Sequence, residues 1–188
     1  MMELRVEHLQ KSYGGSRVLR DVSFTARTGL TRIEGPSGAG KTTLLRILLG
    51  LERPDDGRHN GAAFRWAAVF QEDRLLPGLD AAGNLRFVLG GRYDAARAAA
   101  LLRELGLAEA ADKRVRDYSG GMKRRLALAR ALLAPSDALI LDEPFTGLDA
   151  DNCDAALRCI LRAAEEKIVL LAAHGALALP DGCACVRL

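Results

Sequence analysis

A glycine-rich segment carries the clearest chemical pattern in the chain, Gly35-Pro36-Ser37-Gly38-Ala39-Gly40-Lys41-Thr42. It matches the template Gly-x4-Gly-Lys-Ser/Thr of phosphate-binding loops. Glycines let backbone N–H groups turn inward around phosphates, and the N-terminus of a following helix adds a positive field. We expect Lys41 to bridge the β- and γ-phosphates, the Thr42 hydroxyl to bind Mg²⁺, and Thr43 to belong to the same site. Alone, the pattern predicts only that the chain binds a nucleoside triphosphate.

An acidic pair, Asp142-Glu143, follows the apolar run Leu139-Ile140-Leu141. A buried strand with this sequence carries Asp142 to its C-terminal edge, where a carboxylate can hold Mg²⁺. Glu143 then stands where it can polarise an attacking water. The pair is followed by Pro144, so it also fits a turn or a helix start. Its interpretation therefore depends on the rest of the chain.

A third segment, Tyr118 to Leu132, reads Tyr-Ser-Gly-Gly-Met-Lys-Arg-Arg-Leu-Ala-Leu-Ala-Arg-Ala-Leu. It resembles the signature of ABC ATPases, whose core is Leu-Ser-Gly-Gly-Gln, and it stands between the glycine-rich loop and the acidic pair. A capped helix explains the serine and the glycines only in isolation. Tyr118 and Met122 replace the outer Leu and Gln of the signature, while the Ser-Gly-Gly core is intact.

The resemblance gives this segment a role between two molecules. Ser119, Gly120 and Gly121 are expected at a helix N-terminus, which favours an anion. In the family the signature faces the γ-phosphate bound to the other protomer. The resemblance therefore implies that two chains close over two ATP molecules, and that neither site is complete in a monomer.

Four further positions match the family. Tyr13 resembles the aromatic residue that stacks on adenine, although a core tyrosine at a strand end is an alternative. Gln71 resembles the glutamine that senses Mg²⁺ and the attacking water. Asp149 resembles the residue of a loop that crosses the dimer interface, or it is simply a helix N-cap. His174 resembles the histidine that contacts the γ-phosphate; in isolation it would be an ordinary loop histidine.

The elements that position these groups can be read from the hydrophobic pattern. A strand at 30–34 leads into the glycine-rich loop, and a helix at 42–49 follows it. The polar residues Thr31, Arg32 and Glu34 are unusual for a strand buried on both faces. Residues 51–63 are predicted to be a loop. The remaining expected elements are strands at 4–9, 21–26, 66–70, 138–141 and 168–172, and helices at 94–105, 120–133 and 151–167.

This order predicts an α/β fold: a P-loop NTPase core with a mixed, largely parallel sheet, an N-terminal antiparallel β element and a small helical subdomain at roughly 75–130. We expect one domain over residues 1–188. About 30 residues separate Lys41 from Gln71, so the β element between them looks shortened relative to the family.

Composition limits the possible partners. The chain has 49% hydrophobic and 27% charged residues and a net charge of +3, which does not indicate nucleic acid or a membrane surface. The basic cluster Lys123-Arg124-Arg125 is interpreted as a solvated helix face. The N-terminus has charges where a signal core would lie, and the apolar run 168–173 is shorter than the roughly 20 residues that span a bilayer. The four cysteines are expected to be reduced thiols, although Cys183-Ala-Cys185 could hold a soft metal.

We therefore expect a cytoplasmic ATPase that uses ATP and Mg²⁺. The resemblance implies a second ABC ATPase subunit, in a homodimer, and a transmembrane permease that attaches the chain to the inner face of the membrane. A solute-binding protein is a further implied partner. Residues 71–79 resemble the surface that receives the permease's coupling helix. The same segment is similar to that of importers of small anions and sulfonates. The alternatives are a non-transport ABC ATPase, a P-loop small-molecule kinase, and a nucleotide-binding regulator without turnover.

Overall fold

The fold is taken from a computed structural model, which describes residues 2–173, 179 and 183–188. In this part of the chain the strands form two sheets. The first sheet is antiparallel, in the order β2-β1-β4. It consists of β1 (Glu3–Tyr13), β2 (Ser16–Arg27) and β4 (Asp56–His59). Gly14 and Gly15 make the turn between β1 and β2, and both have positive φ.

The second sheet is parallel throughout, in the order β5-β6-β7-β3-β8. Its strands are β3 (Gly29–Glu34), β5 (Trp66–Val69), β6 (Ala138–Asp142), β7 (Ile168–Ala172) and β8 (Ala184–Arg187). Because the strands are parallel, their carboxyl ends meet at one edge of the sheet. The glycine-rich loop, the residues after β5 and the acidic pair all follow strands at that edge.

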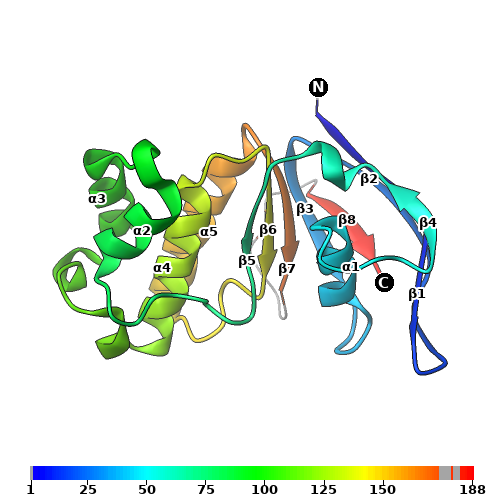
Figure 1. Cartoon of the computed structure of the whole chain (residues 1–188), viewed down its shortest axis with the longest axis horizontal. Helices are drawn as coiled ribbons and strands as arrows, with labels where there is room; N and C mark the ends of the chain where they lie inside the picture. The colour runs from blue at the N-terminus through cyan, green and yellow to red at the C-terminus, as the bar shows by residue number, and fades with distance from the viewer. Residues whose placement is uncertain (1, 174–178, 180–182) are drawn as a thin grey trace.

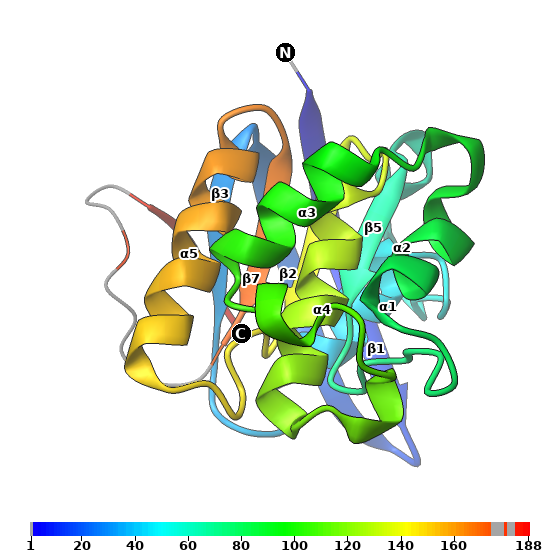
Figure 2. The ribbon, with the colours of Figure 1, turned by 90° about the vertical axis from the view of Figure 1, so that its left-hand side faces the viewer.

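The α-helices of the described chain are α1 (Lys41–Leu48), α2 (Ala81–Leu89), α3 (Ala95–Glu104), α4 (Gly120–Leu133) and α5 (Ala150–Ala164). Helices α2 to α5 form a layer on one face of the parallel sheet, and α1 covers the other face together with the antiparallel sheet (Figure 1). Figure 2 shows α3, α4 and α5 in front of the strands. Single 3₁₀ turns lie at Gly61–Ala63, Gly90–Arg92, Ala108–Ala110 and Val115–Asp117.

Two buried clusters share the parallel sheet between them. In β6, Leu139 and Leu141 pack with the helical layer, while Ala138 and Ile140 pack with α1 and the antiparallel sheet. All four side chains are fully buried. This two-sided burial explains the continuous apolar run before Asp142. The α/β fold class predicted from the sequence is confirmed.

The polar residues of β3 are accommodated by its position between β7 and β8. Thr31 is buried, facing the same side as Ile33. Arg32 and Glu34 face the opposite side, where their side chains lie 3.2 Å apart as an ion pair. Arg187 of β8 lies 3.5 Å from the other oxygen of Glu34. A strand next to the sheet edge can thus carry paired charges that a central strand would exclude.

Two details of the predicted order are wrong. Residues 51–63 do not form a plain loop, because β4 lies within them and pairs with β1. Asn60 anchors this segment, since its side-chain oxygen accepts a hydrogen bond from the Arg5 N–H at 2.8 Å. Strand β8 was not expected either, because the short segment Ala184–Arg187 has no clear apolar alternation.

The stretch at roughly 75–130 contains α2, α3 and most of α4, as its helical pattern predicts. Its apolar side chains belong to the same cluster as those of β5, β6 and β7. Whether it moves as a separate subdomain within a single domain stays a prediction. Among the described residues, no helix combines the length and hydropathy needed to cross a bilayer.

Candidate functional site

The glycine-rich loop connects the end of β3 to the start of α1. Gly40 is the N-cap of α1 and adopts a left-handed conformation, with φ +96°. A Cβ at this position would lie 2.8 Å from side-chain carbons of Val18 and Leu19. Both the backbone conformation and the close contact therefore require glycine. Among the residues that the structure describes, no side chain caps the helix, which leaves its first N–H groups available to an anion.

Lys41 lies inside this loop, with only 8% of its surface exposed. Its ammonium donates hydrogen bonds to the carbonyl oxygens of Gly35 at 2.8 Å and Pro36 at 3.1 Å. The Ala39 N–H closes the turn by donating to the Pro36 carbonyl at 3.2 Å. The loop thus places a buried cation beside a helix N-terminus, which is a suitable environment for phosphate oxygens.

Thr42 and Asp142 meet at the edge of the sheet although they are 100 residues apart in the chain. The Thr42 hydroxyl donates a hydrogen bond to Asp142 Oδ2 at 2.9 Å. Asp142 is only 3% exposed, and this burial raises the pKa of its carboxyl above the usual value, against the lowering effect of the Thr42 hydrogen bond. A hydroxyl and one carboxylate are the hard oxygen donors that Mg²⁺ takes together with substrate phosphates. The residues present therefore fit this metal.

A pocket of about 330 Å³ joins these groups to other predicted residues. Gln71 lies exposed just after β5, and Glu143 lies half-buried just after β6. Glu143 has φ +54°, a left-handed conformation that is uncommon for residues other than glycine. The pocket is lined by Tyr13, Val18, Ser37, Gly38, Gly40, Lys41, Thr42, Thr43, Gln71, Asp142 and Glu143. The ends of β3, β5 and β6 thus bring Lys41, Thr42, Gln71, Asp142 and Glu143 to one cavity.

Tyr13 stands at the end of β1 with 45% of its surface exposed. This exposure argues against a core tyrosine and leaves the ring accessible for stacking. Its hydroxyl donates to the carboxylate of Glu52, and Lys11 Nζ lies 5.4 Å from the ring centroid. Burial and the Glu52 hydrogen bond raise the pKa of Tyr13. Glu52 and Val18 were not expected near this site, because neither lies in a recognisable motif.

Ser119, Gly120 and Gly121 lie at the start of α4, with Ser119 as N-cap. The Ser119 hydroxyl accepts a hydrogen bond from the Met122 N–H at 3.2 Å. None of the three residues lines the pocket that contains Lys41 and Thr42 of the same chain. Gly121 packs closely on the next loop, because a Cβ there would lie 2.8 Å from the Gly147 carbonyl. Tyr118, in place of the signature's leucine, is buried and donates to the Ala110 carbonyl at 2.7 Å.

Asp149 is the N-cap of α5, where its carboxylate accepts a hydrogen bond from the Asn152 N–H at 2.9 Å. This bond lowers the pKa of Asp149. Capping alone explains the residue within one chain, so its role at a dimer interface stays a prediction. His174 lies outside the described residues, and its predicted contact is not tested here.

The interpretation of Lys123-Arg124-Arg125 as a solvated face is wrong for Arg124. This residue is only 3% exposed. Its guanidinium hydrogen-bonds backbone carbonyls after β5 and β6, while Arg125 bonds the Leu105 carbonyl at 2.7 Å. A run of basic residues does not reveal whether carbonyl acceptors will face it, because those acceptors come from distant segments.

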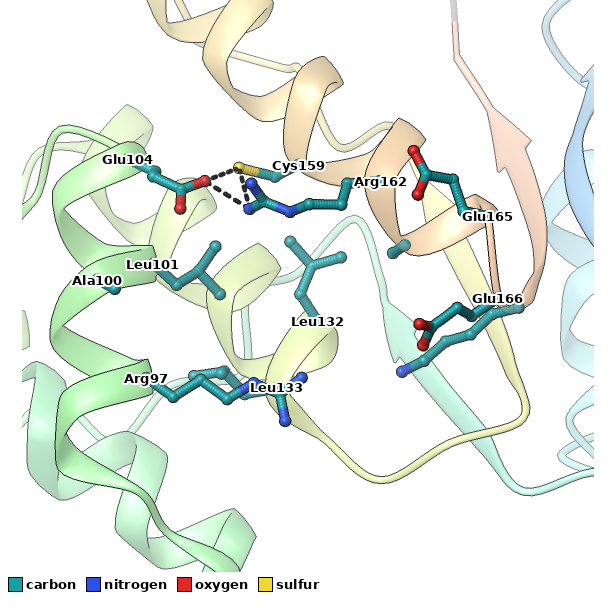
Figure 3. Close-up of a pocket in the computed structure, with 12 residues that line it drawn as sticks. Arg97, Ala100, Leu101, Glu104, Leu132, Leu133, Cys159, Arg162, Glu165 and Glu166 are labelled. Carbon is teal, nitrogen blue, oxygen red and sulfur yellow. Dashed lines mark hydrogen bonds and ion pairs between the residues drawn. The ribbon is translucent and has the colours of Figure 1, made fainter.

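A second pocket, of about 310 Å³, lies between α3, α4 and α5 (Figure 3). Arg162 forms an ion pair with Glu104 at 2.5 Å, and Glu104 also accepts from the Cys159 thiol at 3.5 Å. Burial raises the pKa of Cys159 to about 11, so the thiol is not a reactive nucleophile. The pocket contains none of the predicted site residues. All four cysteines are free, as predicted, and the described residues contain no cluster of three or more His, Cys, Asp or Glu that could hold a metal.

Known proteins resemble this chain over most of its length. The family model for ABC transporters matches residues 19–146. An aliphatic sulfonates import ATP-binding protein of Pseudomonas syringae pv. syringae is 42% identical over 151 residues, which cover 80% of this chain and 63% of that protein. A taurine import ATP-binding protein of Pseudomonas aeruginosa is 42% identical over 146 residues, covering 71% of this chain and 56% of that protein.

Among solved structures, the ATP-binding subunit of an ABC transporter superposes with a TM-score of 0.80 at 28% identity. The match covers 92% of this chain and 80% of that one. The chain thus spans somewhat more than half the length of the two import proteins, and a larger share of the solved subunit.

Proposed function

This chain belongs to the ABC transporter family, and from that premise we propose that it is the ATP-binding and ATP-hydrolysing subunit of a transporter. Two copies would close around two ATP molecules and drive a transmembrane partner. The names of both relatives support transport over a small-molecule kinase or a non-transport ATPase.

The observation that carries the proposal is the division of the predicted residues into two sets. Lys41, Thr42, Asp142 and Glu143 line one pocket, while Ser119 at the start of α4 lies outside it. Ser119 is exposed and stands at a helix N-terminus, which favours an anion. A second copy that presents this helix end to the pocket would complete the enclosure of the terminal phosphate.

Within the pocket, each group has a distinct task. Lys41 and the N-terminus of α1 neutralise the phosphates and hold them in place. Thr42 and Asp142 would hold Mg²⁺, which would supply further charge neutralisation. Glu143 accepts a hydrogen bond from the attacking water and orients it, and Gln71 at the pocket rim contacts the same region. Phosphoryl transfer to water needs this positioning more than it needs covalent chemistry.

If each ATP site is formed by two chains, the rate of ATP hydrolysis per molecule depends on the protein concentration. We expect the rate of ATP hydrolysis per molecule to fall on dilution, because the monomer lacks the second set of phosphate contacts. The measurement is phosphate release by the purified chain over a wide concentration range. A rate per molecule that stays constant down to the lowest concentration would contradict the shared site.

Exposed apolar residues in α2 and in the segment that precedes it support a membrane partner. Phe87 and Val88 of α2 are 72% and 48% exposed, and Leu76 and Leu79 precede that helix with part of their surface exposed. Asn84 ties the two segments together, since its side chain accepts from the Leu76 N–H at 2.8 Å. An exposed apolar set of this kind is typical of an interaction site. It adjoins the predicted surface at residues 71–79, where we propose that the permease binds.

Replacing Phe87 by Glu should separate assembly from catalysis. A buried aromatic anchor contributes about 2 kcal/mol or more to an interface, so affinity for the permease should fall by about 30-fold or more. ATP hydrolysis by the isolated chain should stay within about twofold of the wild type, because Phe87 does not line the pocket. Co-purification of the transmembrane chain from solubilised membranes measures the first effect. Phe87→Leu is the matched control, and an undiminished yield of permease with Phe87→Glu would rule this surface out.

The names of the relatives also indicate a class of cargo. We propose that the permease imports a small sulfonate-type anion and that this subunit works on the cytoplasmic face, with a solute-binding protein delivering the cargo. Identification of the chains and solute that co-purify with the subunit tests these assignments.

A further inference from the structure

Arg124 connects three segments that carry proposed functional residues. It belongs to α4, five residues after Ser119. Its Nε donates to the Glu143 carbonyl at 3.0 Å, and Nη2 donates to the carbonyls of Glu143 and Asp142. Its Nη1 donates to the Phe70 carbonyl, just before Gln71. The same nitrogen lies 3.1 Å from Asp73 Oδ1, which provides a counter-charge.

A buried charge with this many acceptors is unusual and specific. The side chain of Arg124 is 4% exposed, and all three guanidinium nitrogens have partners. Arginine suits the position because its planar group offers five N–H donors in a fixed arrangement. Lysine would present one nitrogen, which can reach the segment after β5 or the segment at the end of β6 but not both at once.

The carbonyl that Arg124 contacts most belongs to a strained residue. Glu143 has φ +54°, a conformation that costs of order 1 kcal/mol or more for a residue with a side chain. The Glu143 N–H donates to the Ala172 carbonyl at 2.8 Å, so β7 holds the other side of the same residue. The hydrogen bonds that Glu143 makes with Arg124 and with Ala172 together fix its backbone, which directs the Glu143 side chain to the pocket.

We propose that Arg124 is a positioning residue for ATP hydrolysis, which holds the backbone of Glu143 in its left-handed conformation against the segment that carries Gln71. The inference rests on the proposed ATPase function. It predicts a defect in the chemical step rather than in ATP binding. Lys41 and Thr42, the proposed phosphate and metal ligands, lie at the start of α1, and within the described part of the chain Arg124 is not seen to hydrogen-bond that helix.

The main test is Arg124→Met, which preserves much of the side-chain volume and removes every donor. We expect kcat to fall about 10- to 100-fold, the effect of a misplaced catalytic group, while KM and the Kd for ATP change less than about threefold. The kcat of Arg124→Lys, which keeps the charge beside Asp73, should fall by about tenfold. This variant carries the test if Arg124→Met does not fold. Thermal unfolding of each variant shows whether the fold is retained.

Arg130 provides a matched control within the same helix. Its guanidinium donates to the carbonyls of Asp73 at 2.8 Å and Arg74 at 2.6 Å, and no bond from it to the segment after β6 is seen in the described chain. Arg130→Met thus loosens the loop after β5 without releasing Glu143, and kcat should stay within about threefold of the wild type.

The outcomes are distinguishable. A wild-type kcat in the Arg124 variants, or an equal loss in Arg124→Met and Arg130→Met, would overturn the role of Arg124 at Glu143 while leaving the ATPase function intact. A wild-type chain that hydrolyses no ATP at any concentration would overturn the proposed function, and this inference with it. A loss of kcat confined to the Arg124 variants, with unchanged KM, supports the inference.

Discussion

Replacing Glu143 by Gln should reduce ATP turnover by about 10²- to 10⁴-fold, the usual contribution of a positioned general base. The amide keeps the size of the side chain but loses the negative charge that orients and polarises water. The backbone should not change, because its contacts with Arg124 and Ala172 use main-chain atoms. Affinity for ATP should therefore persist.

The same variant should accumulate a closed pair of chains. ATP favours closure because only the closed state makes the second set of phosphate contacts, and blocked hydrolysis removes the exit from that state. Size-exclusion chromatography with and without ATP and Mg²⁺ measures the pairing, and phosphate release measures turnover. Glu72→Gln is a suitable control, since it makes the same charge change on a side chain that is 85% exposed. Unaltered turnover in Glu143→Gln would remove Glu143 from the mechanism.

Much of the fold could be predicted because hydrophobic pattern and motif agree locally. The helix after Ser119 was expected at 120–133 and is found at Gly120–Leu133, because a capping serine marks its start and Pro135 follows its end. Strand β7 was likewise expected at its observed bounds, since five consecutive apolar residues are typical of a strand buried on both faces.

The features that were missed depend on partners far away in the sequence. Strand β4 has only four residues, Asp-Gly-Arg-His, and forms because β1 offers an unpaired edge. Arg124 was interpreted as solvated because the carbonyl groups that it contacts, those of Phe70 and Asp142, lie 54 and 18 residues away in the chain. The pairing of Thr42 with Asp142 could be anticipated only because both residues belong to motifs whose relation is known. Local pattern therefore predicted the elements better than it predicted the contacts between them.

Asp142 illustrates how a functional site reduces stability. Burial raises the pKa of its carboxyl, so the folded chain binds this proton more tightly than the unfolded chain does. A raised pKa contributes stability that is present below the ordinary value of 3.8 and is lost as the pH rises through the folded-state pKa. At neutral pH the ionised carboxylate of Asp142 therefore destabilises the fold. On the proposed function, this charge serves to hold Mg²⁺.

Asp142→Asn should consequently raise stability while it lowers activity. In the absence of nucleotide, the free energy of unfolding at pH 7.5 should increase by about 1 kcal/mol, a typical gain for one stabilising substitution. The amide oxygen can still accept the hydrogen bond from Thr42. Loss of the metal ligand should reduce Mg²⁺-dependent turnover by about 10²- to 10³-fold. Thermal and denaturant unfolding and phosphate release measure the two effects, and the stability gain should shrink as the pH falls toward 4.

Asp137, just before the same strand, is a control whose substitution should change stability in the opposite direction. Its carboxylate lies 2.6 Å from the Arg65 guanidinium, whose hydrogen bonds lower the pKa of Asp137 to about 2. Stability from this group is present above pH 3.8 and is lost as the pH falls through about 2, so Asp137→Asn should destabilise the chain at neutral pH. Turnover should be little changed because Asp137 lies at the far end of β6 from the pocket. If both aspartate substitutions changed stability in the same direction, burial of Asp142 would not be the cause of its effect.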